Sequence, residues 1–130
     1  MNVIGRYDMS KMKQSIFSFE TVLARLQHEV VDLIKFDIEG FEWKLLDTVI
    51  KSEHLPKQLA FELHTRHANA NYVPAHLVID KGEEAVLRLF GQLWTLGYRV
   101  VSKEINSGDL RCAEFVLYRF YDGNNSSSSQ

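Results

Sequence analysis

Four ionisable side chains stand at or just beyond the ends of two short apolar runs in this 130-residue chain. They are Asp37, Glu39, Glu62 and His64. Carboxylates and imidazoles can take up and release protons, and they can also bind divalent cations. The two runs, Val31–Phe36 and Gln58–Leu63, are rich in residues that favour β-strands. Whether these side chains form a site depends on whether the two runs are neighbouring strands.

The segment between the two runs predicts a helix. From Gly40 to about Ser52, apolar residues recur at helical spacing, which gives a strand–helix–strand unit. Parallel strands joined in this way open their carboxyl ends onto the same edge of the sheet, where ligands of open α/β folds usually bind. We therefore expect the four side chains to converge at one sheet edge. Polar residues also occur at strand ends simply because the chain leaves the core there.

The rest of the chain predicts further elements of a single α/β domain. These are a helix from Phe19 to about His28 with Ser18 as its N-cap, a loop Thr65–Leu77, a helix from Asp80 to Leu96, and strands Tyr98–Ile105 and Cys112–Phe120. The intervening Asn106-Ser107-Gly108-Asp109 is typical of a hairpin turn, so the last two strands are expected to pair antiparallel.

Side-chain directions follow from the spacing within each element. In the helix after Gly40, the residues expected against the sheet are Phe41, Leu45, Leu46 and Val49, and those expected in solvent are Glu42, Lys44 and Asp47. We interpret Trp43 and Trp94 as core packing. Glu62 and His64 share one face of their strand because they are two residues apart.

One motif resembles a known enzyme family. Residues 35–43 read Lys-Phe-Asp-Ile-Glu-Gly-Phe-Glu-Trp, which resembles the Lys-(apolar)-Asp-(apolar)-Glu-Gly pattern, closely followed by Glu, of the FkbM-type methyltransferases. The likeness extends to Ser18–Glu20, Glu62–His64 and Cys112–Phe115 with Asn106 before it, and covers roughly residues 15–120. The resemblance implies an S-adenosylmethionine-dependent enzyme. It also implies a class I, Rossmann-like methyltransferase sheet of parallel strands that ends in an antiparallel hairpin.

The chain contains no glycine-rich turn of the kind that grips such a cofactor. Its seven glycines stand singly, and no strand–Gly-x-Gly–helix sequence precedes Lys35. The resemblance then implies that residues 1–121 are the carboxyl-terminal portion of a methyltransferase domain whose first strands are missing, followed by a disordered tail at residues 122–130. We assign no cofactor-binding residue. In a partial sheet the strand Val31–Phe36 would have an unpaired, apolar edge that is open to self-association.

The resemblance and the residue chemistry together suggest roles for the site residues. Methyl transfer to an oxygen nucleophile of a small-molecule or glycan-like acceptor needs a group that removes a proton. His64 is the leading general-base candidate because an imidazole titrates near neutral pH, and Asp37 and Glu62 are the other catalytic candidates. Glu39 and Asn106 are candidate substrate-binding residues. Structural interpretations also exist, with Asp37 capping a loop, Glu39 placed at a helix N-terminus and His64 bonded to backbone.

A divalent metal and a non-catalytic role are the alternatives. Asp37, Glu39, Glu62 and His64 offer oxygen and imidazole ligands that suit magnesium, manganese or calcium, although we expect no metal there. The absence of a glycine-rich cofactor-binding turn also fits a non-catalytic remnant or an interaction module.

Composition and charge exclude several other classes of protein. The net charge is −2 at pH 7 and the basic residues are dispersed, so the sequence predicts no basic patch that would bind nucleic acid. No apolar run approaches the roughly 18 residues of a spanning helix, so we expect a soluble chain without a membrane segment. The single cysteine, Cys112, rules out an intramolecular disulfide, and we interpret it as a buried strand thiol.

Overall fold

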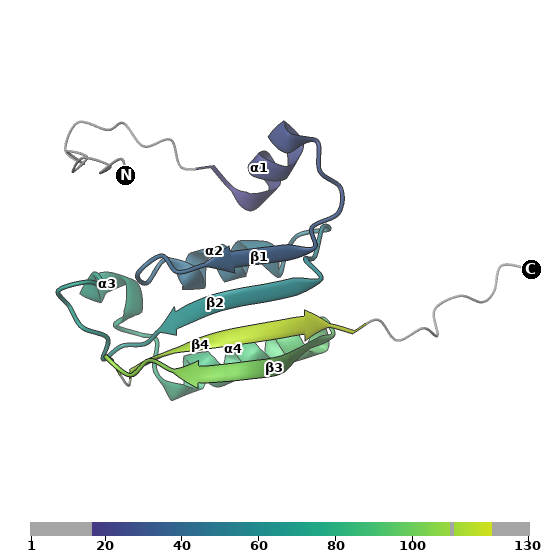
Figure 1. The fold of residues 1–130 in the computed structure, drawn as a ribbon. Coiled ribbons are helices and arrows are strands. Elements are labelled where there is room, and N and C mark those ends of the chain that lie inside the picture. Colours follow the sequence, from purple (N-terminus) through teal and green to yellow (C-terminus); the bar gives the residue numbers. More distant parts are fainter. Residues whose placement is uncertain (1–16, 110, 121–130) are drawn as a thin grey trace, which may run out of the picture.

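The computed structural model describes residues 17–109 and 111–120. In chain order, the elements within this part are α1 (Phe19–Leu26), β1 (Leu33–Phe36), α2 (Glu42–Val49), β2 (Gln58–His64), α3 (Ala75–Val78), α4 (Glu83–Thr95), β3 (Tyr98–Ile105) and β4 (Cys112–Arg119) (Figure 1). The predicted tail at residues 122–130 lies outside the described residues. No helix in the described part is both long and apolar enough to cross a membrane.

The four strands form one mixed sheet in the order β1-β2-β4-β3. β1 and β2 are parallel, which confirms the predicted strand–helix–strand unit. β3 and β4 are the predicted antiparallel hairpin, and β4 also pairs antiparallel with β2. The sheet is therefore mostly antiparallel, with one parallel pair, rather than mainly parallel. β1 lies at the edge of the sheet.

Apolar side chains between the sheet and two helices form the main core. α2 and α4 lie on the same side of the sheet (Figure 1). The enclosed members of this core include Leu46 and Val49 of α2, Leu93 of α4, Leu59 of β2 and Leu117 of β4. Burial of each such side chain contributes about 1.5–3 kcal/mol. This core fixes the position of β2 and therefore of the polar residues that β2 carries.

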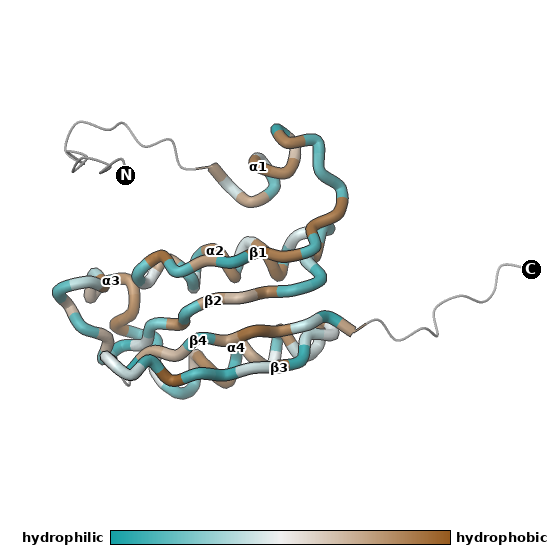
Figure 2. The backbone as a smooth tube through the Cα atoms, viewed as in Figure 1, coloured by the Kyte–Doolittle hydropathy of each residue, from teal (hydrophilic) through white to brown (hydrophobic). Residues whose placement is uncertain are grey.

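Strand alternation places the polar residues of β2 on the face opposite the helices. Leu59, Phe61 and Leu63 pack into the core, so Glu62 and His64 point the other way, as their spacing predicts. Figure 2 shows apolar residues along much of β1 and β4, whereas the segments that connect the elements are largely hydrophilic. The candidate site is therefore built on the sheet face that α2 and α4 leave uncovered.

Some predicted boundaries were wrong. α4 begins at Glu83 with Gly82 at its N-cap position, not at Asp80. The physical reason is that Lys81 is tied to the preceding turn, because its N–H bonds the Val78 carbonyl and its own carbonyl accepts from Arg66. That turn follows the short α3, which begins within the predicted loop and ends one residue beyond it. The first helix begins at Phe19 with Ser18 as its N-cap, which confirms that prediction, but it ends at Leu26.

Two predicted core positions are exposed. Trp94 is 61% exposed, and the Arg99 guanidinium carbon lies 3.3 Å from the centre of its ring. The buried residues of α4 are Leu89 and Leu93, and Trp94 is turned away because it lies one residue beyond the second of them. Phe41 is also exposed, because it precedes the first turn of α2. Trp43 packs partly against the core, as predicted.

Candidate functional site

The four predicted side chains do converge at the carboxyl ends of β1 and β2. The His64 Nε2 atom lies 3.5 Å from Glu39 Oε2 and 3.6 Å from Glu62 Oε2. Asp37 shares a hydrogen bond with Glu62. Asp37 and Glu39 are exposed, whereas Glu62 and His64 are buried. The cluster therefore has a buried base and a rim that solvent and ligands can reach.

A fifth member, Glu42, was predicted to face solvent and is instead completely buried. Its Oε1 atom accepts hydrogen bonds from the Ile38 N–H at 3.0 Å and lies 3.1 Å from His64 Nδ1, and its Oε2 atom accepts from the Gly40 N–H at 2.9 Å. The prediction was wrong because Leu46 and Val49 lie four and seven residues after position 42. That spacing fits the buried stripe of α2 or its margin, so from the sequence it gives a signal for Glu42 but does not decide its direction.

The turn between β1 and α2 is shaped by two residues with positive φ. Glu39 has φ 52° and Gly40 has φ 101°. A side chain at position 40 would also be excluded by its neighbours, since a Cβ atom there would lie 2.9 Å from Val73 Cγ1 and 3.3 Å from Leu77 Cβ. Left-handed backbone at a residue other than glycine is uncommon and tends to occur where surrounding contacts hold it. In this turn it brings the Glu39 Oε2 atom to 3.5 Å from His64 Nε2.

His64 is buried, and carboxylates lie beside both of its ring nitrogens. Burial is the largest single effect on the ring and lowers its pKa, whereas the hydrogen bond with Glu42 raises it. The negative charges of Glu42, Glu62 and Glu39 act in the same direction, so the pKa of His64 lies above its ordinary 6.5. The imidazole therefore holds a proton more readily than an ordinary histidine, and in its protonated form it balances part of the surrounding negative charge.

Asp37 and Glu62 behave as a coupled pair of carboxyl groups. Burial of its carboxyl group and the charge of Glu62 raise the pKa of Asp37 from 3.8 to about 6. Burial is the largest single effect on Glu62 and raises its pKa. The hydrogen bonds from Asn106, Cys112 and Asp37, together with the charge of His64, outweigh burial, so that the pKa of Glu62 lies below the ordinary 4.5. The two environments push the pKa values apart. Asp37 is thus the member that exchanges a proton closer to neutral pH.

Asn106, which was predicted to bind substrate, is hydrogen-bonded to Glu62. Its Nδ2 atom donates to Glu62 Oε1 at 2.6 Å, and its Oδ1 atom accepts from the Gly108 and Asp109 N–H groups. Cys112 donates to the same Glu62 oxygen at 3.3 Å and is buried, as predicted. Burial and the hydrogen bond to Glu62 raise the pKa of Cys112 to about 12, so this thiol stays protonated.

Further glutamates continue the carboxylate cluster across the sheet. Glu62 pairs with Glu114 on β4, and Glu114 pairs with Glu104 on β3. Paired residues on adjacent strands share a face, so three carboxylates form one row. Glu104 and Glu114 are both exposed. This end of the uncovered face offers many hydrogen-bond acceptors, and it suits a ligand that donates hydrogen bonds.

Two overlapping sets of residues have the spacing of metal ligands. Asp37, Glu39 and His64 form one set, and Glu62, His64 and Cys112 form the other, with the ligand atoms of each set within 4.8 Å of one another. The first set matches the predicted oxygen-and-imidazole alternative. In the second set the protonated Cys112 thiol disfavours a metal, because cysteine binds metals as the thiolate. The divalent-cation alternative therefore remains a prediction for the first set together with Glu62.

The charge state of His64 predicts a pH dependence of stability. Because its folded pKa is raised, His64 stabilises the fold fully below its unfolded pKa of 6.5, and this contribution is lost as the pH rises through the folded value. Between about pH 6 and about pH 8, wild-type protein is expected to lose more unfolding free energy than a His64→Gln variant. Urea denaturation of both proteins at the two pH values measures the difference. Equal losses would contradict a raised pKa.

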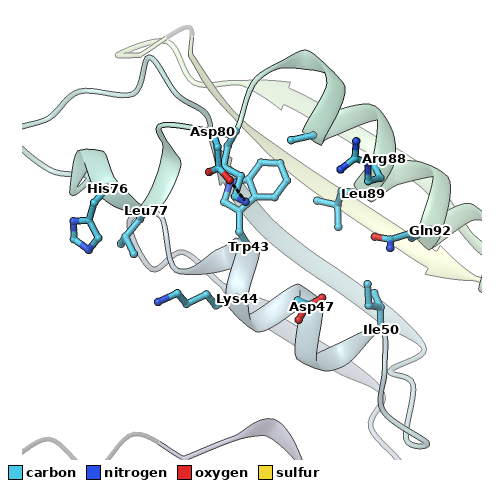
Figure 3. Close-up of a pocket in the computed structure, with 12 residues that line it drawn as sticks. Trp43, Lys44, Asp47, Ile50, His76, Leu77, Asp80, Arg88, Leu89 and Gln92 are labelled. Atoms are coloured by element: carbon cyan, nitrogen blue, oxygen red, sulfur yellow. Dashed lines mark hydrogen bonds and ion pairs between the residues drawn. The ribbon is translucent and has the colours of Figure 1, made fainter.

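A separate cavity of about 470 Å³ lies between α2 and α4 (Figure 3). Its lining includes Trp43, Lys44, Arg88 and Gln92 but none of the clustered residues. Its charged side chains are largely engaged with neighbours, as in the pair of Lys81 with Asp80 at 3.2 Å. Trp43 connects the two regions, because its indole lines the cavity and donates to the His64 carbonyl at 2.8 Å. The titratable chemistry therefore resides in the carboxylate–histidine cluster and not in this cavity.

Comparison with known proteins identifies the family. No curated protein and no solved structure matches the chain. The model of the methyltransferase FkbM domain matches residues 4–100, about three quarters of the chain. The match begins earlier than the resemblance described above and ends within β3, so it includes the whole turn around Gly40 and all of β2 but not β4. The chain therefore belongs to the family of methyltransferase FkbM domains.

Proposed function

We propose that this domain takes part in S-adenosylmethionine-dependent methyl transfer to a hydroxyl oxygen of a small-molecule or glycan-like acceptor. Membership of the family supports methyl transfer in general. The observation that carries the rest is the carboxylate cluster, in which an exposed carboxyl group of raised pKa is hydrogen-bonded to a buried carboxylate. Hydroxyl groups donate hydrogen bonds to carboxylates, so a neutral, hydroxyl-rich acceptor fits this surface.

In this proposal Asp37 removes the acceptor proton. Its pKa of about 6 is closer to neutral pH than that of an ordinary aspartate, and its carboxyl group is accessible. We assign this role to Asp37 rather than to His64, because His64 is buried and both of its ring nitrogens already face carboxylates. Glu62 accepts a hydrogen bond from the protonated Asp37, and its negative charge favours the uptake of the acceptor proton by Asp37. His64 provides the compensating positive charge, and Glu39 at the rim binds the acceptor.

The cofactor would supply an electrophilic methyl group, but the described residues do not fit its usual cradle. The turn after β1 contains Gly40, yet the Gly40 and Ile38 N–H groups are both bound by Glu42. They are therefore not free to bind a cofactor. We assign no cofactor-binding residue, and we propose that this chain is the acceptor side of a methyltransferase domain whose cofactor-binding strands precede it in a longer protein.

This proposal predicts different cofactor binding by two proteins. The isolated 130-residue chain is expected to bind S-adenosylmethionine weakly or not at all, whereas a longer natural form that includes preceding strands is expected to bind it at micromolar concentration. Isothermal titration calorimetry measures both affinities. The longer form is also expected to transfer a labelled methyl group to members of a panel of hydroxylated acceptors. Micromolar binding by the isolated chain would contradict the division of roles.

An interaction module is the second candidate function. The observation that favours it is a row of apolar surface on the uncovered face, where Leu33 and Tyr118 pair with Gln58 from either side. Leu33 is 52% exposed and Tyr118 is 40% exposed. The uncovered face next to the edge strand β1 would also serve the predicted self-association. Failure of every natural form to bind the cofactor would favour this candidate over methyl transfer.

A further inference from the structure

We propose that Glu42 is a positioning residue of this site, because from the core it holds both the turn at residues 37–40 and the ring of His64. This inference rests on the proposed function for its catalytic consequence, but its structural part does not. Glu42 does not touch solvent, since its side chain is completely buried. Its influence on a bound acceptor can therefore only pass through the groups that it contacts.

The first contact is with the turn. The two Glu42 oxygens accept hydrogen bonds from the Ile38 and Gly40 N–H groups, which flank the positive-φ residue Glu39. These bonds satisfy two backbone donors of the turn that precedes α2. They also hold Glu39 in a conformation that is rarely adopted without such support. Loss of the carboxylate would release the turn and move the Glu39 side chain relative to His64.

The second contact is with the imidazole. An ionised Glu42 can only accept a hydrogen bond, so His64 Nδ1, at 3.1 Å, must carry a hydrogen. The ring orientation that results directs Nε2 toward Glu39 and Glu62. Trp43 binds the His64 carbonyl separately, so α2 holds the backbone and the ring of this residue through two independent bonds. Removing the Glu42 charge should free the ring and leave the strand in place.

A chain of contacts then links Glu42 to the proposed proton acceptor. Glu42 orients His64, His64 lies beside Glu62, and Glu62 shares its hydrogen bond with Asp37. The charged and titratable groups around the ring come from several elements. They are Glu42 from α2, Glu39 from the turn, Glu62 from β2 itself, Asp37 from the end of β1 and Cys112 from β4. Asp37 and Cys112 are connected to the ring through their hydrogen bonds with Glu62. Glu42 is the completely buried member of this set, and its carboxylate accepts hydrogen bonds from two backbone N–H groups of the turn.

The test is Glu42→Gln, which keeps the size of the side chain and removes its charge. The variant is expected to lower the His64 pKa and to shift the neutral ring toward the tautomer with hydrogen on Nε2, because an amide can donate to Nδ1. Nitrogen-15 NMR of the His64 ring measures both changes in the 130-residue chain without any assay of methyl transfer. A residue that only filled space would not alter the tautomer.

The same variant has a kinetic readout in the form of the protein that transfers methyl groups. Turnover is expected to fall by about 10- to 100-fold with little change in the acceptor KM, as is typical when the hydrogen-bond partner of a site imidazole is lost. Asp47→Asn is the matched control, because Asp47 lies on the same helix, is exposed and pairs with Lys51. It should leave the ring and the turnover unchanged.

A second variant keeps the inference testable if Glu42→Gln does not fold. Glu42→Asp retains the charge but is one carbon shorter, so it cannot reach the turn and the ring together. We expect a folded protein with a raised His64 pKa and reduced turnover. Wild-type ring chemistry in Glu42→Gln, or wild-type turnover in Glu42→Asp, would overturn the proposal. Altered ring chemistry without any methyl transfer by the wild-type protein would instead count against the proposed function.

Discussion

Replacing Asp37 by asparagine is expected to lower methyl-transfer turnover by about 10²- to 10⁴-fold, the usual contribution of a positioned proton acceptor. The asparagine amide can still donate a hydrogen bond to Glu62, so the shape of the site is kept while its capacity to accept a proton is lost. Comparison of turnover with wild-type and variant protein, in the natural form that binds the cofactor, measures this effect.

The same substitution is expected to maintain or raise the melting temperature at about pH 7. Burial and the neighbouring Glu62 raise the pKa of Asp37 from 3.8 to about 6. The folded protein therefore binds this proton more tightly than the unfolded chain, and stability falls as the pH rises between these two values. Above that window the ionised Asp37 disfavours the fold, and asparagine removes the charge. Lower activity together with undiminished stability is the signature expected of a functional group.

Asp32→Asn is the matched control for this prediction. Asp32 precedes β1 at the opposite end from the cluster, and its exposed carboxylate pairs with Lys57 at 2.6 Å. Exposed ion pairs of this kind contribute about 0–1 kcal/mol, so the control should change neither turnover nor melting appreciably. Full activity of the Asp37 variant would remove this residue from the proposed mechanism. A clearly lower melting temperature would instead support a structural, loop-capping role.

Replacing Gly40 by alanine is expected to lower the unfolding free energy by about 2–6 kcal/mol. Alanine at φ 101° carries a conformational penalty of about 1–3 kcal/mol. Its Cβ atom would also lie 2.9 Å from Val73 Cγ1, and forcing a methyl group into packed surroundings typically costs about 1–3 kcal/mol. Val73 belongs to a small buried cluster with Leu77 and Val78, so the clash falls on groups with little room to move. Urea denaturation measures the loss.

Gly91→Ala provides a control with the opposite expected sign. Gly91 lies inside α4, and a Cβ atom added there meets nothing within 4 Å. Alanine in an open helical position is expected to raise the unfolding free energy by about 0.5–1 kcal/mol, because glycine loses more backbone freedom on folding. The two substitutions are chemically identical, so a difference in sign isolates the geometry of the turn. Equal effects would show that Gly40 does not occupy the described conformation.

Local patterns in the sequence determined most of the secondary structure. The apolar runs, the helical spacing between them and the Asn-Ser-Gly-Asp turn indicated β1, α2, β2 and the final hairpin, because these elements form largely from short-range preferences. The two-residue spacing of Glu62 and His64 correctly placed both on one face. The parallel connection likewise indicated that Asp37 would lie near them, because such a connection brings the strand ends to one edge.

Long-range packing decided which polar residues build the interior of the site. Asn106 reaches Glu62 across 44 positions, and this contact exists only because β4 lies between β2 and β3. Nothing in the turn sequence specifies which hairpin strand will pair with β2. Trp94 illustrates the same limit, since its helical position is close to the core stripe but its ring lies over Arg99 on the outside.

Glu42 shows most clearly which features the sequence determined and which only the tertiary structure decided. The sequence placed it at the start of a helix, and its spacing from Leu46 and Val49 fits either a buried stripe or its margin. A carboxylate is buried only where enough hydrogen-bond donors converge to repay its loss of hydration. Those donors, the Ile38 and Gly40 N–H groups and the His64 ring, come from β2 and from the turn that precedes α2. They meet only after the chain has folded, so the tertiary structure alone decided that this glutamate faces inward.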